Sequence, residues 1–167
     1  DHVDSLARFE RRAVETLVRW SARLHWENLV QGDAFEQEGL GPLDFGHWAG
    51  HRLEMLSGHE LMHGEAVAIG AAIDTLLSVM LTKFPVDSAR AVIETLAGLG
   101  FPLWHEALEK TTESGALALT GGLADYQERL GRPIRLLRRL GEPRNCDGVC
   151  EEAIAAAVAA LSRWKGV

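Results

Sequence analysis

One segment, residues 63–82, limits what this chain can fold into more than any other. Its centre reads AVAIGAAIDTLLSVML and is apolar on nearly every side at helical periodicity. A helix of that composition is predicted to be the central buried helix of a domain. The chain has 167 residues, which is enough to bury a sizeable core. Residues 1–167 are therefore predicted to form a single, mainly α-helical domain.

The remaining elements are predicted from apolar periodicity and from the glycines and prolines that interrupt it. Residues 3–29 favour one long amphipathic helix, residues 31–43 a loop, and residues 47–56 a helix that ends at Ser57-Gly58. Asp87 or Ser88 would cap the helix that follows residue 82. The later predicted elements are helices over 89–99, 103–109, 111–130 with an interruption at Gly121-Gly122, and 147–164, with a short strand pair near 133–145 whose first strand is expected to be exposed.

The most informative functional signal is a cluster of histidines. Four of the seven histidines lie within seventeen positions, at His47, His51, His59 and His63. Histidine is the commonest metal ligand and the usual proton-transfer group near neutral pH. His47 and His51, four residues apart, share one face of the predicted helix, and an antiparallel helix pair would bring His63 back beside His47. With a carboxylate, this donor set suits zinc or a similar divalent ion. For His47 and His51 alone, an alternative is equally open: one histidine caps the helix start and the other packs against the core.

Residues 59–63 read H-E-L-M-H, which matches the zinc-peptidase pattern with Glu60 as general base. The longer form of that pattern requires a glycine and a third histidine that this chain lacks at those positions. Gly58 and Gly64 flank the five residues, which favours a loop entering a helix. A zinc peptidase is kept as a third hypothesis.

Composition excludes several classes of function. The formal net charge of −7 argues against a surface that binds nucleic acid. No apolar run is expected to be long enough to span a membrane. The charged first residues do not resemble a signal peptide, so a cytoplasmic location is expected.

Cys146 and Cys150 have no partner ligands nearby and are expected to be unpaired thiols. The arginines between residues 135 and 144 are expected to form a solvated face, although they could bind an anion. The sequence also shows no glycine-rich nucleotide cradle.

Residues 44–51, D-F-G-H-W-A-G-H, and residues 63–70, H-G-E-A-V-A-I-G, resemble the dehydroquinate synthase family, also called the sugar-phosphate cyclases. That family carries N-F-G-H-x-x-G-H and H-G-E-x-V-A-I-G with the same separation. The resemblance extends from about Ala7 to about Leu140. With Asp44 in place of the usual Asn, this motif is more similar to the epi-valiolone-synthase-like and uncharacterised bacterial branches than to the shikimate-pathway enzymes. The fold that this resemblance implies is the family's helical C-terminal, metal- and substrate-binding domain.

The resemblance assigns roles to individual positions. It implies that His47 and His63 are metal ligands for zinc or cobalt. His51 falls on a histidine that lies close to the substrate and handles protons. Asp44 falls on a substrate-binding, catalytic position, and Glu36 on a nearby acidic substrate-binding position. Glu65 would contact a metal-binding histidine without contacting the metal itself.

Several positions depart from the family pattern. The family's third metal ligand, a glutamate in A-E-x-x-K, and the whole NAD-binding domain have no counterpart in this chain. A basic residue is missing near Leu40 or Gly41, and lysines are replaced near Trp26 and at Tyr126-Gln127. In the family such residues hold phosphate and carboxylate. Their replacement points to another sugar phosphate or to lost activity.

The function that the resemblance implies is half of a carbon–oxygen lyase. The whole enzyme would convert a seven-carbon ketose phosphate to a cyclitol by transient NAD oxidation, phosphate elimination and aldol cyclisation. NAD would be held mainly by the N-terminal half, either a separate subunit of a split, heteromeric enzyme or a missing portion, and an oligomer is expected. With two ligands of its own, the isolated chain is expected to bind zinc or cobalt weakly. The alternative is a catalytically inactive partner or regulatory subunit of the same fold.

Overall fold

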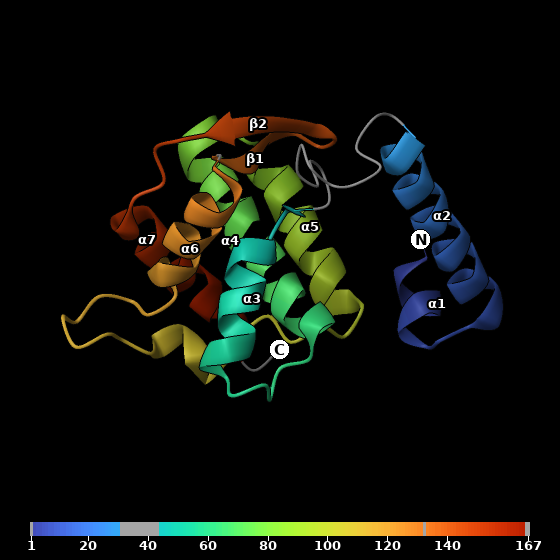
Figure 1. Cartoon of the computed structure of the whole chain (residues 1–167). Helices are drawn as coiled ribbons and strands as arrows, with labels where there is room; N and C mark the ends of the chain where they lie inside the picture. The colour runs from blue at the N-terminus through green and yellow to red at the C-terminus, as the bar shows by residue number, and fades with distance from the viewer. Residues whose placement is uncertain (1, 31–43, 132, 166–167) are drawn as a thin grey trace.

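The computed structural model describes residues 2–30, 44–131 and 133–165 (Figure 1). The helices α3 to α7 and a β-hairpin gather in one body, and α1 and α2 lie at one side of it. The elements in chain order are α1 (Val3–Ala7), α2 (Arg11–Val30), α3 (His47–Leu56), α4 (His63–Thr82), α5 (Val86–Gly98), the 3-10 helix η2 (Glu106–Glu109), α6 (Thr120–Leu130), β1 (Ile134–Arg139), β2 (Glu142–Cys146), α7 (Glu151–Leu161) and the 3-10 helix η3 (Ser162–Trp164).

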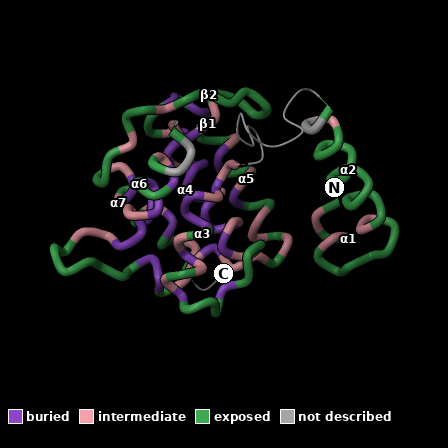
Figure 2. Tube along the Cα trace, in the orientation of Figure 1, coloured by how far each residue is buried: buried purple, intermediate pink, exposed green. Residues whose placement is uncertain are grey.

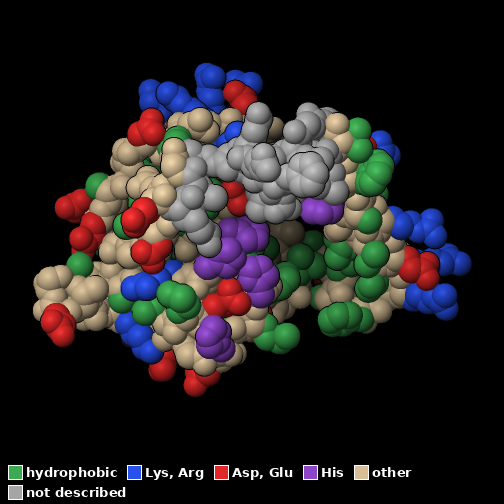
Figure 3. Space-filling view, viewed as in Figure 1, with side chains coloured by type: hydrophobic (Ala, Val, Ile, Leu, Met, Phe, Trp, Pro, Cys, Tyr) green, Lys and Arg blue, Asp and Glu red, His purple; other side chains and the backbone are tan. Residues whose placement is uncertain are grey.

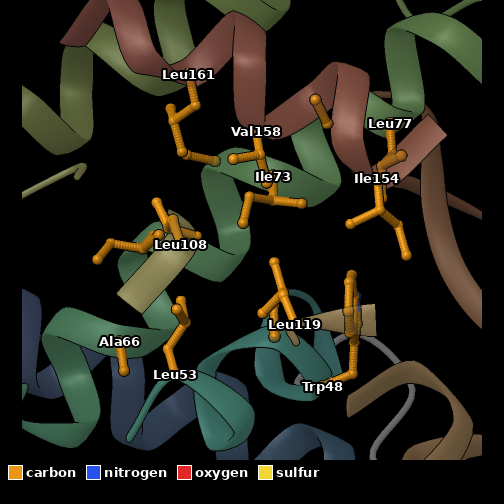
Figure 4. Packing of buried hydrophobic residues seen from close by; sticks show 14 of the residues in the cluster. Trp48, Leu53, Ala66, Ile73, Leu77, Leu108, Leu119, Ile154, Val158 and Leu161 are labelled. Carbon is orange, nitrogen blue, oxygen red and sulfur yellow. The ribbon is translucent and has the colours of Figure 1, made fainter. Parts of the chain in front are cut away.

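Helix α4 is the centre of the body, as the sequence predicts. It packs against α3, α5, α7 and β1. Ile73 and Leu77 are fully buried, and they face Ile154, Val158 and Leu161 of α7 in the core (Figure 4). The buried part of the chain follows α4 through the middle of the body (Figure 2). Burial of these large apolar side chains, each contributing about 1.5–3 kcal/mol, supplies the main stabilisation of the fold.

The apolar length of α4 corrects one expectation from the sequence. An 18-residue window of this helix has a mean hydropathy of 1.6, so α4 is long and apolar enough by composition to cross a membrane. The expectation that this chain has no apolar run long enough for a membrane span is therefore wrong. In this fold 56% of the window is buried against neighbouring elements. The enclosure of α4 by those elements accounts for its composition.

Two glycines allow α3 and α4 to cross with their backbones in contact. Gly46, just before α3, has φ +81°, a conformation that favours glycine. A Cβ on Gly46 would lie 2.4 Å from the backbone nitrogen of Ala71, and a Cβ on Gly70 would lie 2.0 Å from the carbonyl oxygen of Gly46. Both distances are far below any real contact, so this crossing requires glycine at both positions. The crossing places the start of α3 beside the first half of α4.

The N-terminal region forms two helices, whereas the sequence predicts one long helix. Phe9, between α1 and α2, has φ 54° and breaks the helix there. Leu17, Trp20 and Leu24 share one face of α2 at helical spacing and are 50%, 56% and 55% exposed. Helix α2 therefore presents apolar side chains that the described part of the body does not cover.

The segment before α6 also differs from its prediction. The sequence predicts helix over 111–130, but the α-helix begins at Thr120, and Thr111 instead forms an isolated bridge with Leu117. Gly121 and Gly122 lie inside α6 and do not interrupt it. A Cβ on Gly122 would lie 2.9 Å from the carbonyl oxygen of Trp48, so this glycine allows α6 to approach α3 closely.

Boundaries elsewhere shift by a few residues. Helix α5 starts at Val86 with Pro85 at its N-cap, so the predicted caps Asp87 and Ser88 lie inside the helix. Within the predicted helix 103–109 only η2 is helical, and the closing helix α7 is shorter than predicted. The predicted strand pair is confirmed, with Ile134 opposite Cys146. Its first strand is buried on one face, where the sequence predicts an exposed strand, because Leu136 and Ile134 pack into the core.

Candidate metal and substrate site

Three imidazole rings form a nearly equilateral triangle where α3 meets the start of α4. His47 and His51 come from α3, and His63 is the first residue of α4. The ring centroids are 5.7 Å apart for His47 and His51, 5.6 Å for His47 and His63, and 5.5 Å for His51 and His63. Three imidazoles on one zinc ion, with Zn–N bonds of about 2.0–2.1 Å, would have ring centres roughly 5 Å apart. The predicted approach of His63 to His47 is confirmed.

The triangle faces solvent on one side and the core on the other. His51 and His63 are exposed, and histidine side chains gather on one face of the molecule (Figure 3). His47 is half-buried, and its Nδ1 is a buried atom without a hydrogen-bond partner among the described residues. An unsatisfied buried polar atom is costly, and a water, ligand or ion that supplies the partner removes that cost. This atom fits a site that binds a cation.

A carboxylate from α3 contacts the triangle. Oε2 of Glu54 lies 3.1 Å from Nδ1 of His63. The Glu65 carboxylate, which the resemblance places behind a metal-binding histidine, instead accepts a hydrogen bond from the backbone N–H of Met62 at 2.9 Å and caps α4. The sequence contained a signal for Glu54: His47, His51 and Glu54 are spaced i, i+4 and i+7, which places all three on one helix face.

Together these side chains provide nitrogen and oxygen donors for a divalent ion. Ligand atoms of His51, Glu54 and His63 lie within 4.8 Å of one another. This group of donor atoms includes Glu54 and does not include His47, although the His47 ring is adjacent to the rings of His51 and His63. Histidine and carboxylate ligands suit zinc and cobalt. The assignment of His47 and His63 as the metal ligands stays a prediction.

A pocket opens next to His51. It has a volume of about 190 Å³ and is lined by Trp48, His51, Arg52, Met55, Gly122, Asp125 and Tyr126. The Tyr126 hydroxyl donates a hydrogen bond to Oδ2 of Asp44 at 2.9 Å, which connects the predicted substrate residue Asp44 to the pocket wall. Tyr126 lies in the stretch, Tyr126-Gln127, where the family resemblance predicts a lysine. The predicted residue Glu36, with Leu40 and Gly41, lies outside the described residues.

A buried carboxylate that the sequence analysis did not single out lies behind the site. The Asp74 side chain is buried in α4 and accepts hydrogen bonds from the Gly46 backbone N–H and from Nε1–H of Trp48, both at 2.7 Å. Burial raises the pKa of Asp74 to about 7, although these two hydrogen bonds lower it. The signal available in the sequence was that Asp74 is the one carboxylate of this apolar helix beyond its first turn.

The zinc-peptidase pattern at residues 59–63 does not lie on a helix. Helix α4 begins only at His63, and His59 has φ 66°. The Glu60 carboxylate is 74% exposed and lies 3.8 Å from Nε2 of His105. The predicted loop is confirmed. Because the two histidines of the pattern are not one helical turn apart, they lack the arrangement that a peptidase zinc site uses.

The remaining sequence signals lie elsewhere. Cys146 and Cys150 are free thiols, as predicted. Arg138, Arg139 and Arg144 of the hairpin line, with Lys83, a separate open hollow of about 550 Å³. This basic surface does not include any of the clustered histidines.

Comparisons with known proteins agree with the fold. The family model for the C-terminal region of 3-dehydroquinate synthase matches residues 1–121. The chain is 32% identical to 2-epi-5-epi-valiolone synthase of Streptomyces glaucescens over 169 residues, which cover 98% of this chain and 42% of that protein. It is 33% identical over 154 residues to 3-dehydroquinate synthase of Methylacidiphilum infernorum, with 91% of this chain and 42% of that protein covered.

A solved structure gives the same result. ValA, the 2-epi-5-epi-valiolone synthase of Streptomyces hygroscopicus subsp. jinggangensis 5008, was solved with NAD+ and Zn2+ bound. It aligns with 97% of this chain and 44% of its own, with a TM-score of 0.81 and 26% sequence identity. The chain therefore belongs to the 3-dehydroquinate synthase family and has the fold of its helical C-terminal domain. It spans less than half the length of these relatives.

Proposed function

We propose that this chain is the metal- and substrate-binding half of a sugar-phosphate cyclase. With an NAD-binding half it would act as a carbon–oxygen lyase in the cytoplasm. Its reaction would convert a seven-carbon ketose phosphate to a cyclitol by transient oxidation at NAD, elimination of phosphate and aldol ring closure. The observation that carries this proposal is the triangle of imidazoles at His47, His51 and His63, next to a pocket and within the family's two sequence motifs.

The residues of this chain take distinct roles in the proposal. His47 and His63 hold the divalent ion, zinc or cobalt, and a carboxylate from the other half completes its coordination. The ion, when bound, supplies Lewis-acid polarisation of substrate oxygens. His51 is exposed at the pocket and accepts or returns a proton at the substrate. Asp44, held by Tyr126, accepts a hydrogen bond from a substrate hydroxyl.

The exposed surface of α2 supports a requirement for a second half. Leu17, Trp20 and Leu24 form an apolar stripe on a helix that the described part of the body leaves uncovered. Apolar stripes of this kind are characteristic of interfaces. ValA binds NAD+ and is more than twice as long as the part of it that this chain matches. The NAD-binding half, as a domain or a separate subunit, is the partner that we assign to this surface.

The test combines the chain with an NAD-binding half, NAD, zinc or cobalt, and sedoheptulose phosphate. Phosphate release is measured together with the appearance of a cyclic product. We expect release that is lost in His63→Ala and kept in His59→Ala, because His59 lies in the loop before α4. Release that is equally fast in His63→Ala would refute the proposal.

A second candidate is a partner or regulatory subunit without catalytic activity. The observation that favours it is the absence of the expected lysine around Tyr126-Gln127, where the Tyr126 hydroxyl instead donates to Asp44. With Arg52 as the only arginine or lysine side chain among the described residues that line the pocket, the site would hold a phosphate and a carboxylate poorly. A complex that forms with the NAD-binding half but releases no phosphate from a range of ketose phosphates would favour this candidate.

A further inference from the structure

The contact between Glu54 and His63 links the two helices that build the site. Glu54 belongs to the last turn of α3, and His63 is the first residue of α4. The Glu54 side chain is 22% exposed, whereas the His63 side chain is 55% exposed. The carboxylate is therefore the better fixed of the two groups, and the imidazole is the group whose orientation depends on the contact.

The other carboxylates around His63 have different partners. Glu65 bonds to the backbone N–H of Met62 and so belongs to the cap of α4. The Glu60 carboxylate lies 3.8 Å from Nε2 of His105. Glu54 is thus the carboxylate in hydrogen-bond contact with the His63 ring among the described residues, at 3.1 Å from Nδ1.

A neutral imidazole has one N–H donor and one nitrogen that accepts. A carboxylate 3.1 Å from Nδ1 stabilises the proton on that atom, because an ionised carboxylate can only accept. The lone pair then lies on Nε2, the nitrogen on the other side of the ring. Histidines that bind metals usually donate their second ring N–H to a carboxylate or carbonyl, which fixes the tautomer and the orientation of the ring.

We propose that Glu54 is a positioning residue that holds His63 in the Nδ1–H tautomer, with Nε2 left to bind a cation beside His47 and His51. The role in metal binding rests on the proposed function, because it takes His63 as a ligand. The tautomer does not depend on the proposed function and can be measured without metal. Glu54 is also one of the three donor groups that lie within 4.8 Å of one another, but in this proposal it acts through His63 and does not itself bind the ion.

The first measurement is the tautomer of His63 by NMR on the 167-residue chain with ¹⁵N-labelled histidine rings. Without metal, we expect a protonated Nδ1 and an unprotonated Nε2. In Glu54→Ala that preference should be lost, whereas Glu54→Gln should keep much of it because its amide oxygen still accepts. Glu65→Ala is the matched control and should leave the tautomer unchanged. A wild-type ring protonated on Nε2, or a tautomer unchanged in Glu54→Ala, would overturn the proposal.

The second measurement is zinc binding by the same variants, followed by calorimetry and by the ring ¹⁵N shifts. We expect zinc on Nε2 of His63 with Nδ1 still protonated, and affinity about 10–100-fold weaker in Glu54→Ala, the usual effect of removing such a partner. Glu65→Ala should bind as the wild type does. Zinc on Nδ1, or unchanged affinity in Glu54→Ala, would overturn the proposal while leaving the cyclase assignment intact. Unchanged affinity in His63→Ala would instead refute the metal site of the proposed function.

Discussion

Asp74 and Trp48 are joined by a buried hydrogen bond of 2.7 Å from the indole Nε1–H to Oδ1 of the carboxylate. The second oxygen of Asp74 accepts the backbone N–H of Gly46 at the same distance. One side chain of α4 thus holds the residue before His47 and the residue after it. Because α3 begins at His47, Asp74 fixes the start of the helix that carries two of the three imidazoles.

The first prediction concerns the pH dependence of stability. Burial raises the pKa of Asp74 from 3.8 to about 7, so the folded state holds a proton that the unfolded state has released. Its stabilising contribution is complete below about pH 4 and is lost as the pH rises toward 7, by up to about 1.4 kcal/mol per pH unit. The free energy of unfolding in urea, measured from pH 4 to pH 8, should therefore contain a falling component that levels off above pH 7.

Asp74→Asn isolates this component from the titration of other groups. The variant should be less stable by about 1–3 kcal/mol at pH 5, because its amide NH₂ faces a backbone or indole N–H and leaves a buried donor unsatisfied. The difference in unfolding free energy between wild type and variant should shrink as the pH rises from 4 to 7. A difference that is constant over this range would show that Asp74 does not titrate there.

The second prediction concerns the crossing of α3 and α4. Gly70→Ala would bring a Cβ to 2.0 Å from the carbonyl oxygen of Gly46, so the helices must separate. We expect a loss of about 1–3 kcal/mol or more in unfolding free energy. Gly64→Ala is the matched control in the same helix, with no atom within 4 Å of the added Cβ, and should not destabilise. Equal stability of both variants would contradict the close crossing.

The sequence predicts the fold well where local pattern and burial agree. The all-round apolar run of residues 63–82 and the glycine-bounded helix 47–56 are both found with those limits. The prediction of a single long helix over 3–29 was wrong because Phe9 adopts a left-handed backbone conformation, which apolar periodicity does not reveal. The prediction of helix over 111–119 was wrong because the chain turns back on itself there, and Thr111 and Leu117 form a local antiparallel bridge that apolar periodicity does not reveal.

The candidate site was predictable in its histidines but not in its supporting carboxylates. The spacing of His47 and His51, and the recurrence of His63 after a short connection, required only that the two helices pair. The partners of the imidazoles and of the helix start depend on side-chain contacts across the crossing. Residue spacing alone therefore does not identify Glu54 as the partner of His63. Nor does it identify Asp74 as the acceptor at the start of α3, although Asp74 lies in the most strongly predicted helix.

The third prediction concerns the exposed face of α2. Trp20→Glu should change the stability of the chain by no more than about 0.5 kcal/mol, because this side chain is 56% exposed. Affinity for the NAD-binding half should fall about tenfold or more, since exposed tryptophans often carry much of the energy of an interface. Leu140→Glu, at the exposed end of the hairpin, is the control and should bind normally. Unchanged affinity in Trp20→Glu would place the interface elsewhere.

The fourth prediction concerns Tyr126. Tyr126→Phe removes the hydroxyl that bonds to Asp44, a hydrogen bond to a charged group worth about 1.5–3 kcal/mol. With the NAD-binding half present, kcat/KM for the ketose phosphate should fall about 10–100-fold. Asp125→Asn in the same pocket should have little effect. Asp125 is exposed, and its carboxylate comes no closer than 3.9 Å to the Arg52 guanidinium, so this ion pair is weak. A Tyr126→Phe enzyme with wild-type kinetics would show that Tyr126 does not position Asp44.

The convergence of His47 and His63 on one cation is tested most directly by titrating the chain with Co²⁺ and following the visible absorption of the bound ion. We expect weak binding with a spectrum of mixed nitrogen and oxygen coordination, unchanged in His59→Ala and lost in both His47→Ala and His63→Ala. Micromolar or tighter binding that survives His47→Ala would contradict a shared site and, with it, the assignment of this chain as the metal-binding half of a cyclase.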